Sequence, residues 1–143
     1  MARPPTAPDL PLTTLSGQKI RLGQLRGHVV LLNFWSTDCP SCLRERPLLA
    51  DLHRRYASRG LAVIAVAMPY DPPNRLVRFV KTHPAPYETA LDPAGAVSRA
   101  FQVTLVPTTL LIAADGVVTW RHTGVPDAGR LQSMIETLLS RGE

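Results

Sequence analysis

Cysteine is scarce in this chain: its 143 residues include only two, Cys39 and Cys42, with two residues between them. Long apolar runs are missing too, because none approaches the roughly 18 residues that a membrane-spanning helix needs. The opening stretch MARPPTAPDLPL also lacks the apolar core of a secretory signal. These absences leave two interpretations open: a cytosolic protein, or a protein from which a leader has been removed.

Clustered charge is also missing. The formal net charge of +5 comes almost entirely from arginine, since Lys19 and Lys81 are the only lysines, and the basic residues are scattered along the chain. A nucleic-acid-binding protein usually gathers its basic residues on one face or interleaves them with stacking aromatic side chains. We therefore expect no nucleic-acid partner.

Strand-like and helix-like segments alternate along the chain, which predicts an α/β fold with helices on both faces of a sheet. We expect a central mixed sheet that is largely parallel, with an antiparallel edge formed by the last hairpin. The length fits a single domain over residues 1–143, with an extended, proline-rich lead-in at 1–9. The predicted strand regions are 12–22 (a hairpin around Ser16-Gly17), 28–35, 61–68, 89–91 and 108–122 (a hairpin through Ala114-Asp115-Gly116).

The longest predicted helix follows the cysteines. Its apolar positions recur at near-helical spacing through Leu49, Leu52 and Tyr56. Gly60 should end it, and Pro47 should kink it. Further helices are predicted from Pro72 or Pro73, across 94–101, and from Asp127 onward with Leu131, Met134, Ile135, Leu138 and Leu139 inward.

The segment Cys39-Pro40-Ser41-Cys42 admits several kinds of chemistry. Structural zinc would need two more ligands, and the four histidines lie far apart and are never paired, so we expect no metal. Covalent haem attachment needs a histidine directly after the second cysteine, where this chain has Leu43. A purely structural disulfide would close a loop too short to constrain the unfolded chain strongly. Redox chemistry remains.

The position of the pair supports redox chemistry. An apolar strand ends just before it and a helix begins with it, and Pro40 suits the first helical turn. Cys39 therefore lies at or beside the N-cap, where free backbone N–H groups and the helix dipole stabilise a thiolate, the attacking species. Cys42, about one turn further on, can resolve a mixed disulfide by attacking the sulfur of Cys39.

Three stretches of the chain resemble one known family. GHVVLLNFWSTDCPSCLRERP is similar to the active-site segment of TlpA/ResA-like thioredoxin-fold thiol–disulfide oxidoreductases. DLPLTTLSGQKIRLGQLRG resembles the N-terminal hairpin of that family, and VPTTLLIAADGVV its proline loop and closing hairpin. The resemblance covers about residues 8 to 140 and implies a thioredoxin fold with an N-terminal β-hairpin and an inserted helix within 69–91.

The resemblance also implies roles for individual residues. Pro107 would be the cis-proline beside the cysteines, and the backbone of Val106 would then pair with an incoming peptide. Trp35 would shield the site, with Pro40 between the cysteines. No metal or organic cofactor is implied, only the redox-active pair.

The partners implied by the resemblance are proteins. They would be protein substrates bearing thiols or disulfides, such as an apocytochrome or another exported protein, and a thiol protein that returns the pair to its reduced form. Family members usually work in the periplasm or cell envelope behind a leader or membrane anchor. Two cysteines that both belong to the active pair fit an oxidising compartment, and they fit the cytoplasm as well.

Three positions depart from the family pattern and are candidate modulators. Asp38 precedes Cys39 where an aromatic residue is common, and its carboxylate would disfavour the thiolate and make the pair more reducing, which favours a reductase. The alternative is that Asp38 points to solvent or caps the helix and has little effect on the potential. Asn33 stands where classical thioredoxins have a buried aspartate as proton acceptor, so that base is missing. Asp71 is a candidate proton shuttle for Cys42, and the alternative is that it caps the following helix.

Two rival functions fit less well. A peroxiredoxin needs a proline and a threonine or serine ahead of its peroxidatic cysteine, and here Ser36 is present but Leu32 occupies the proline position. A copper-binding thioredoxin-fold chaperone would use a three-residue gap between its cysteines and a histidine just ahead of the proline loop, and this chain has neither.

Overall fold

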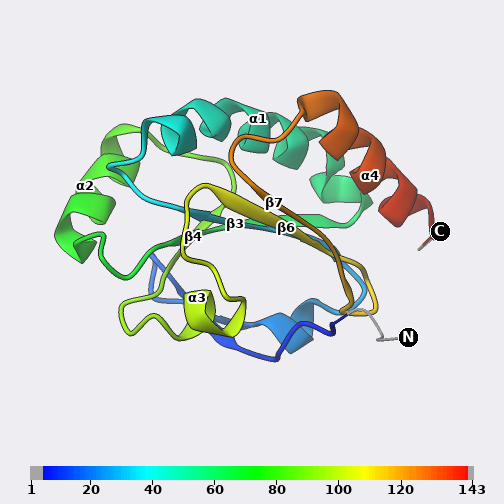
Figure 1. Cartoon of the computed structure of the whole chain (residues 1–143), viewed down its shortest axis with the longest axis horizontal. Helices are drawn as coiled ribbons and strands as arrows, with labels where there is room; N and C mark the ends of the chain where they lie inside the picture. Colours follow the sequence, from blue (N-terminus) through cyan, green and yellow to red (C-terminus); the bar gives the residue numbers. More distant parts are fainter. Residues whose placement is uncertain (1–4, 142–143) are drawn as a thin grey trace.

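A computed structural model of the chain describes residues 5–141. Within them, seven strands form one mixed sheet in the order β2-β1-β5-β4-β3-β6-β7. Helices lie on both faces of this sheet (Figure 1), as predicted from the alternation of strands and helices.

The centre of the sheet is built from three apolar strands: β3 (Val29–Trp35), β4 (Leu61–Ala67) and β6 (Thr108–Ile112). All seven residues of β3 are buried, as expected for a strand covered on both faces. β3 runs parallel to β4 and antiparallel to β6. The predicted strand regions 28–35 and 61–68 are therefore confirmed to within a residue.

The direction of the sheet differs from the prediction. Of its six neighbouring strand pairs, only β3–β4 and β4–β5 are parallel, so the predicted mixed sheet is confirmed, but the expectation that most of it is parallel is wrong. The N-terminal hairpin joins the main sheet because β1 pairs antiparallel with β5, and the last hairpin enters antiparallel to β3. The strands outside the centre are β1 (Pro11–Thr14), β2 (Lys19–Arg21), β5 (Glu88–Leu91) and β7 (Val118–Thr123).

Alternate residues of β3 face two separate cores. Leu31 packs in the core beneath α1 (Pro40–Tyr56) and α4 (Ala128–Arg141), whereas Leu32 packs in the core that includes α3 (Ala96–Ala100). This alternation explains why the strand is apolar at every position except Asn33. The remaining helix, α2 (Pro73–Thr82), buries Leu76 in the first core, and short 3₁₀ turns occur at Leu22–Leu25 and Ala57–Arg59.

Helix ends follow local capping signals with small shifts from the predicted bounds. α1 contains Pro47 and gives way after Tyr56 to a 3₁₀ turn that ends at Gly60, whose φ of 107° suits glycine. The helix predicted over 94–101 is shorter, and the Asp92 carboxylate accepts hydrogen bonds from the backbone N–H groups of Val97 and Ser98 at 3.0 and 2.9 Å. Among the helices within residues 5–141, none is long and apolar enough to cross a membrane.

The described part of the lead-in is attached to the last hairpin. The backbone N–H of Ala7 donates to Gly116 and that of Val118 donates to Pro5, both at 2.8 Å. Residues 1–4 of the predicted lead-in lie outside the described residues. The ends of the described chain and the turn between β3 and α1 lie at opposite ends of the long axis of the molecule (Figure 1).

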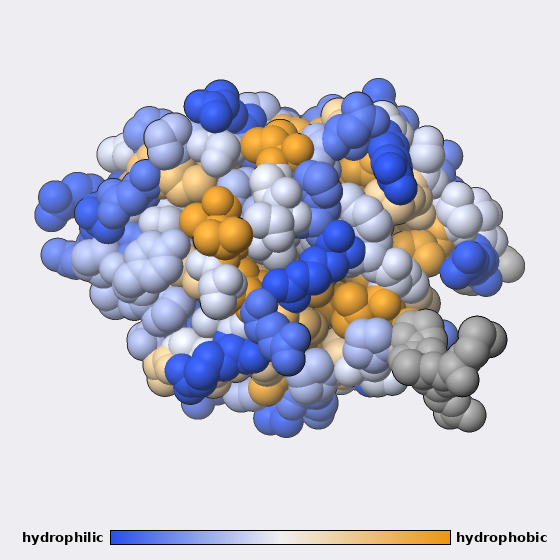
Figure 2. All heavy atoms as spheres, viewed as in Figure 1, coloured by the Kyte–Doolittle hydropathy of each residue, from blue (hydrophilic) through white to orange (hydrophobic). Residues whose placement is uncertain are grey.

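The face of the molecule seen in Figure 1 carries a mixed surface. Figure 2 shows its hydrophobic side chains as separate patches between hydrophilic ones. This face therefore presents no single continuous apolar area.

The N-cap of α4 offers a test of the helix assignment. Asp127 Oδ2 accepts a hydrogen bond of 2.9 Å from the backbone N–H of Arg130, at the residue where the sequence predicted this helix to begin. We expect Asp127→Ala to lower the free energy of unfolding by about 1 kcal/mol, because a helix N–H loses its partner. Asp127→Asn retains the acceptor and should lower the free energy of unfolding by only a few tenths of a kcal/mol. Urea titrations of the wild type and both variants measure these losses. Equal losses in the two variants would contradict the capping role.

Candidate active site

The two cysteines lie at the turn where β3 ends and α1 begins. Cys39 is the N-cap residue of α1, in extended conformation (φ −103°, ψ 103°), and its Sγ accepts a hydrogen bond of 3.1 Å from the backbone N–H of Cys42. Pro40 occupies the first helical position, where its missing N–H removes no helical hydrogen bond. The predicted N-cap placement of Cys39 is therefore confirmed.

The two sulfurs differ in accessibility. They are joined in a disulfide with an S–S distance of 2.30 Å. Cys39 is partly exposed, whereas Cys42 is only 2% exposed and packs in the core beneath α1 and α4. An incoming group can therefore reach the sulfur of Cys39 before that of Cys42.

The predicted proline loop precedes β6. The Val106–Pro107 peptide bond is cis, and Pro107 is buried with its carbonyl accepting a hydrogen bond from Gly124 N–H at 2.7 Å. Val106 is partly buried and packs against both cores, including the one that contains Cys42. Leu105 just before it is 65% exposed, so an exposed apolar side chain leads into this loop.

Trp35 lies in the core at the end of β3. It is 2% exposed, its ring centroid lies 5.9 Å from that of Phe79, and the guanidinium of Arg46 lies 5.5 Å from its centroid. Its indole Nε1 is buried without a hydrogen-bond partner among the described residues. Trp35 therefore links β3 to α1 and α2 through ring and cation contacts.

A buried carboxyl group lies one helical turn beyond Cys42. Glu45 is 1% exposed, and its Oε1 accepts a hydrogen bond of 2.7 Å from Asn33 Nδ2 while its Oε2 accepts one of 3.2 Å from Thr109 Oγ1. Burial raises the pKa of Glu45 to about 7, and the hydrogen bonds from Thr109 and Asn33 act in the opposite direction. Glu45 can therefore gain or lose a proton near neutral pH.

Glu45 is a functional candidate that the sequence analysis missed. Asn33 does not titrate, but its side-chain amide donates a hydrogen bond to Glu45, which does. A titratable carboxyl group is therefore present near Cys42 although the position of the buried aspartate is taken by Asn33. The signal was available in the sequence. Position 45 shares the helical stripe of Cys42, Leu49, Leu52 and Tyr56, so a charged residue falls in the middle of an otherwise apolar face.

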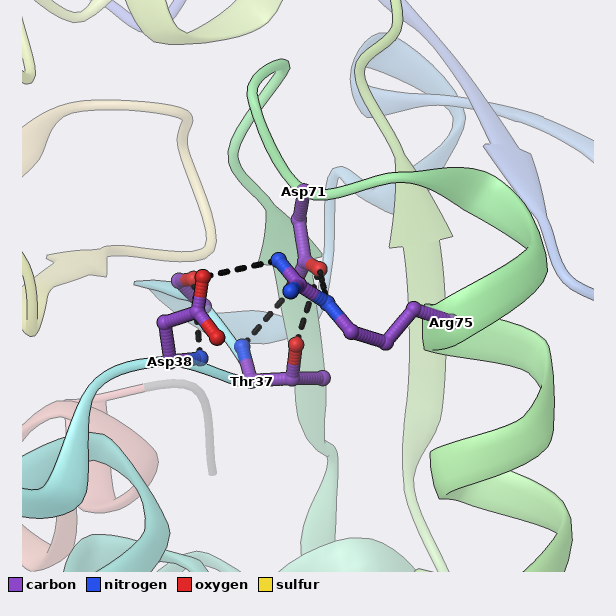
Figure 3. Close-up of polar contacts among 5 residues, drawn as sticks. Thr37, Asp38, Asp71 and Arg75 are labelled. Carbon is purple, nitrogen blue, oxygen red and sulfur yellow. Dashed lines mark hydrogen bonds and ion pairs between the residues drawn. The ribbon is translucent and has the colours of Figure 1, made fainter.

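Asp71 does not cap α2, which corrects one of its two predicted roles. The N-cap of α2 is Pro72, without a side-chain hydrogen bond. Asp71 is buried, and its two oxygens instead accept hydrogen bonds of 2.8 Å from the backbone N–H and the hydroxyl of Thr37 (Figure 3). The carboxylate therefore holds the turn that leads to Cys39.

Asp38 and Arg75 complete this polar cluster. Arg75 Nη2 donates to Asp38 Oδ2 at 2.8 Å, and its Nε donates to Asp71 Oδ1 at 3.3 Å (Figure 3). Asp38 is largely exposed, with 63% of its side-chain surface accessible, and Arg75 retains 44%. The residue before Cys39 is thus tied to α2 through an arginine.

Comparison with known proteins gives a consistent result. A model of the Redoxin family matches residues 4–139. The thiol–disulfide oxidoreductase ResA of Bacillus thuringiensis subsp. konkukian is 32% identical over 133 residues, which cover 92% of this chain and 76% of the relative. ResA of Halalkalibacterium halodurans is 34% identical over 128 residues, which cover 90% and 70%.

Solved structures share the same architecture. The solution structure of a candidate thioredoxin from Neisseria meningitidis superposes with a TM-score of 0.89 at 33% identity, covering 96% of this chain and 92% of that one. The crystal structure of a thiol:disulfide interchange protein of the thioredoxin family from Chlorobium tepidum gives 0.86 at 26% identity, covering 97% and 99%. The α/β thioredoxin fold expected from the resemblance is confirmed.

Proposed function

This chain belongs to the ResA-like thiol–disulfide oxidoreductases of the Redoxin family, and from that premise we propose that it is a disulfide reductase whose attacking group is Cys39. The observation that carries the assignment is the difference between the two sulfurs. Cys39 is partly exposed and its Sγ accepts a helix N–H, whereas Cys42 is buried behind it. A hydrogen bond to sulfur and the N-terminal end of a helix both favour the thiolate.

The reaction follows from these positions. The Cys39 thiolate attacks one sulfur of a disulfide in a protein substrate, forms a mixed disulfide and releases the other sulfur as a thiolate. Cys42 then loses its proton and attacks the sulfur of Cys39, releasing the second substrate thiolate. Two electrons pass to the substrate, and the Cys39–Cys42 disulfide remains until a thiol protein reduces it.

Glu45 is the base that we assign to the second step. It is buried on the same helical face as Cys42, and side chains three residues apart on a helix are neighbours. With a pKa of about 7 it is ionised in part of the molecules at neutral pH and can accept the Cys42 proton. Asp71 is less suited to the shuttle role considered from the sequence, because its hydrogen bonds attach it to Thr37 and Arg75 on the Cys39 side, whereas Glu45 lies one helical turn from Cys42.

The direction of electron flow follows from charge near Cys39. Asp38 and Asp71 contribute two negative charges to the cluster and Arg75 one positive charge, a net charge of −1. Negative charge disfavours a neighbouring thiolate, and a less stable reduced form makes the couple more reducing. This balance supports a reductase rather than an oxidase.

The substrate-binding surface that we propose includes the proline loop. An extended substrate segment would pair with the backbone of Val106 beside Pro107, with the exposed Pro40 on the cysteine side. Trp35 would support this surface from the core and would not contact the substrate. The exposure of Leu105 and the partial exposure of Cys39 support binding on this side of the molecule. Backbone pairing of this kind, together with an exposed apolar side chain, suits an extended segment of a protein substrate.

We further propose that residues 1–143 act as a single domain in the periplasm or cell envelope, tethered to the membrane in the full-length form. Both cysteines lie in the redox pair, which suits an oxidising compartment where other thiols would be trapped. Apocytochromes and other exported proteins with cysteine pairs are the substrates that this location would supply. A cytoplasmic location is the alternative, and fractionation of cells that express the full-length protein distinguishes the two.

Reaction of single-cysteine variants with an aromatic disulfide tests the assignment of the two sulfurs. We expect reduced Cys42→Ser to react with 5,5′-dithiobis(2-nitrobenzoate) at pH 7 at least about tenfold faster than reduced Cys39→Ser. The sulfur that remains in Cys42→Ser is that of Cys39, which is both partly exposed and stabilised as a thiolate. Cys42→Ser should also retain a substrate peptide as a mixed disulfide on Cys39, detected by mass spectrometry. A faster reaction of Cys39→Ser would reverse the roles.

Equilibration of the wild-type protein with glutathione tests the direction. A potential near the thioredoxin value of about −270 mV supports the reductase, whereas one near the DsbA value of about −120 mV would identify an oxidase.

A further inference from the structure

We propose that Arg75 raises the redox potential of the Cys39–Cys42 pair by offsetting the carboxylates of Asp38 and Asp71 near Cys39. The proposal rests on the function proposed above, in which Cys39 forms the reactive thiolate. It adds a positioning residue on α2 that belongs neither to the cysteine segment nor to the proline loop.

The position of Arg75 is defined by a buried group. Asp71 has a fully buried side chain, and its Oδ1 accepts from Arg75 Nε at 3.3 Å. The same carboxylate accepts two hydrogen bonds of 2.8 Å from Thr37, two residues before Cys39. Asp71 therefore joins Arg75 to the turn that carries the reactive sulfur (Figure 3).

The free end of Arg75 reaches the residue directly before Cys39. Its Nη2 lies 2.8 Å from Asp38 Oδ2, the shortest ion pair among those found in residues 5–141. The guanidinium thus engages two carboxylates through different nitrogens, Nε toward Asp71 and Nη2 toward Asp38. A rigid planar fork suits this geometry, and a lysine could not reproduce it.

The electrostatic consequence has a definite sign. Only the reduced protein carries a charge on Cys39, so neighbouring charges change the free energy of the reduced form and leave the disulfide form nearly unaffected. Removal of Arg75 changes the net charge of the cluster from −1 to −2 and should destabilise the thiolate. The couple then becomes more reducing, and its equilibrium constant for oxidation by glutathione disulfide rises.

The size of the effect is set by solvent. The side chains of Arg75 and Asp38 retain 44% and 63% of their accessible surface, so water and salt screen their charges. Exposed pairs contribute modestly, and we therefore expect Arg75→Gln to raise the equilibrium constant about two- to fivefold at low ionic strength. Asp38→Asn should lower it by a similar factor.

The experiment compares Arg75→Gln with Arg78→Gln and with the double variant Asp38→Asn/Arg75→Gln by glutathione equilibration at pH 7. Arg78→Gln removes the same charge one turn along α2 and should leave the constant within about 1.5-fold of wild type, because a charge further from the site is screened. The double variant restores the net charge of −1 and should return close to wild type. Raising the salt to about 1 M, where the screening length is about 3 Å, should reduce the effect of Arg75→Gln, a response that a purely structural role would not produce.

Alkylation of Cys39 in the Cys42→Ser background provides the second readout. Arg75→Gln should move the midpoint of the rate–pH profile upward, in line with the rise of the equilibrium constant. If Arg75→Gln matches wild type in both measurements, or if its shift is unchanged by salt and by Asp38→Asn, the proposal is wrong. A wild-type protein without a reversible dithiol–disulfide couple would instead contradict the proposed function itself.

Discussion

Cys39→Ser is expected to abolish catalysed reduction of insulin disulfides, so that only the rate of the reductant alone remains. The substitution removes the partly exposed sulfur at the N-cap of α1 and leaves only the buried sulfur of Cys42. Serine at this position keeps an acceptor for the helix N–H groups, so the helix should still form. The measurement is the turbidity of precipitating insulin chains under excess dithiothreitol.

Cys42→Ser is the matched control for this prediction, because it separates the first chemical step from turnover. It should also lose turnover, yet still complete one attack per molecule and stop as a mixed disulfide on Cys39. A rapid-mixing experiment should therefore find a stoichiometric first phase in Cys42→Ser and none in Cys39→Ser. A first phase in Cys39→Ser would show that the buried sulfur attacks and that access does not determine the order of reaction.

Glu45→Gln is expected to lower the rate of the resolving step about 100-fold above pH 7, the size of a typical general-base contribution. In the wild type this rate should rise as Glu45 ionises around its pKa of about 7. Glutamine keeps the size of the side chain and can still pair with Asn33 and Thr109, whose hydroxyl can accept as well as donate. Single-turnover kinetics from pH 5 to 9 should show a rise in the wild type that is absent from the variant.

The same substitution should change how stability depends on pH. Because folding raises the pKa of Glu45 from 4.5 to about 7, the folded protein retains a proton that the unfolded chain has lost. The contribution of Glu45 to stability is therefore most favourable below pH 4.5. It falls as the pH rises from 4.5 to about 7, and it is constant above that. The loss amounts to roughly 3 kcal/mol at 1.36 kcal/mol per pKa unit.

Urea unfolding of the disulfide form at pH 4.5, 6 and 8 isolates this contribution, since neither cysteine titrates. The difference in unfolding free energy between wild type and Glu45→Gln should change by roughly 3 kcal/mol between pH 4.5 and pH 8. A difference that is independent of pH would mean that folding leaves the pKa of Glu45 at its unfolded value, and would contradict its assignment as a base that titrates near neutral pH.

Local patterns were sufficient to predict the strand, the turn and the helix around the cysteines. Three signals act over only a few residues: a β-branched run, a proline at the first helical position and an apolar helical repeat. The structure contains the strand and the helix that they predict. The exposure difference between Cys39 and Cys42 follows from the same local geometry. These parts of the site needed no knowledge of distant contacts.

Long-range contacts account for the errors. Asp71 carried the local signature of a helix cap, but its carboxylate is used by Thr37, which lies 34 residues earlier. The pairing of β1 with β5 depends on which edge of the sheet is free, and no short pattern encodes that. The same holds for Glu45: its position on the apolar stripe was readable, but its partners Asn33 and Thr109 come from β3 and β6.

The arrangement of the molecule along its long axis has a practical consequence. The described chain ends lie away from the turn that carries the disulfide (Figure 1). A fluorescent label, an affinity tag or a solid support attached through either terminus would thus leave the reactive face directed to the bulk solution. Immobilised protein should capture oxidised targets about as well as protein free in solution.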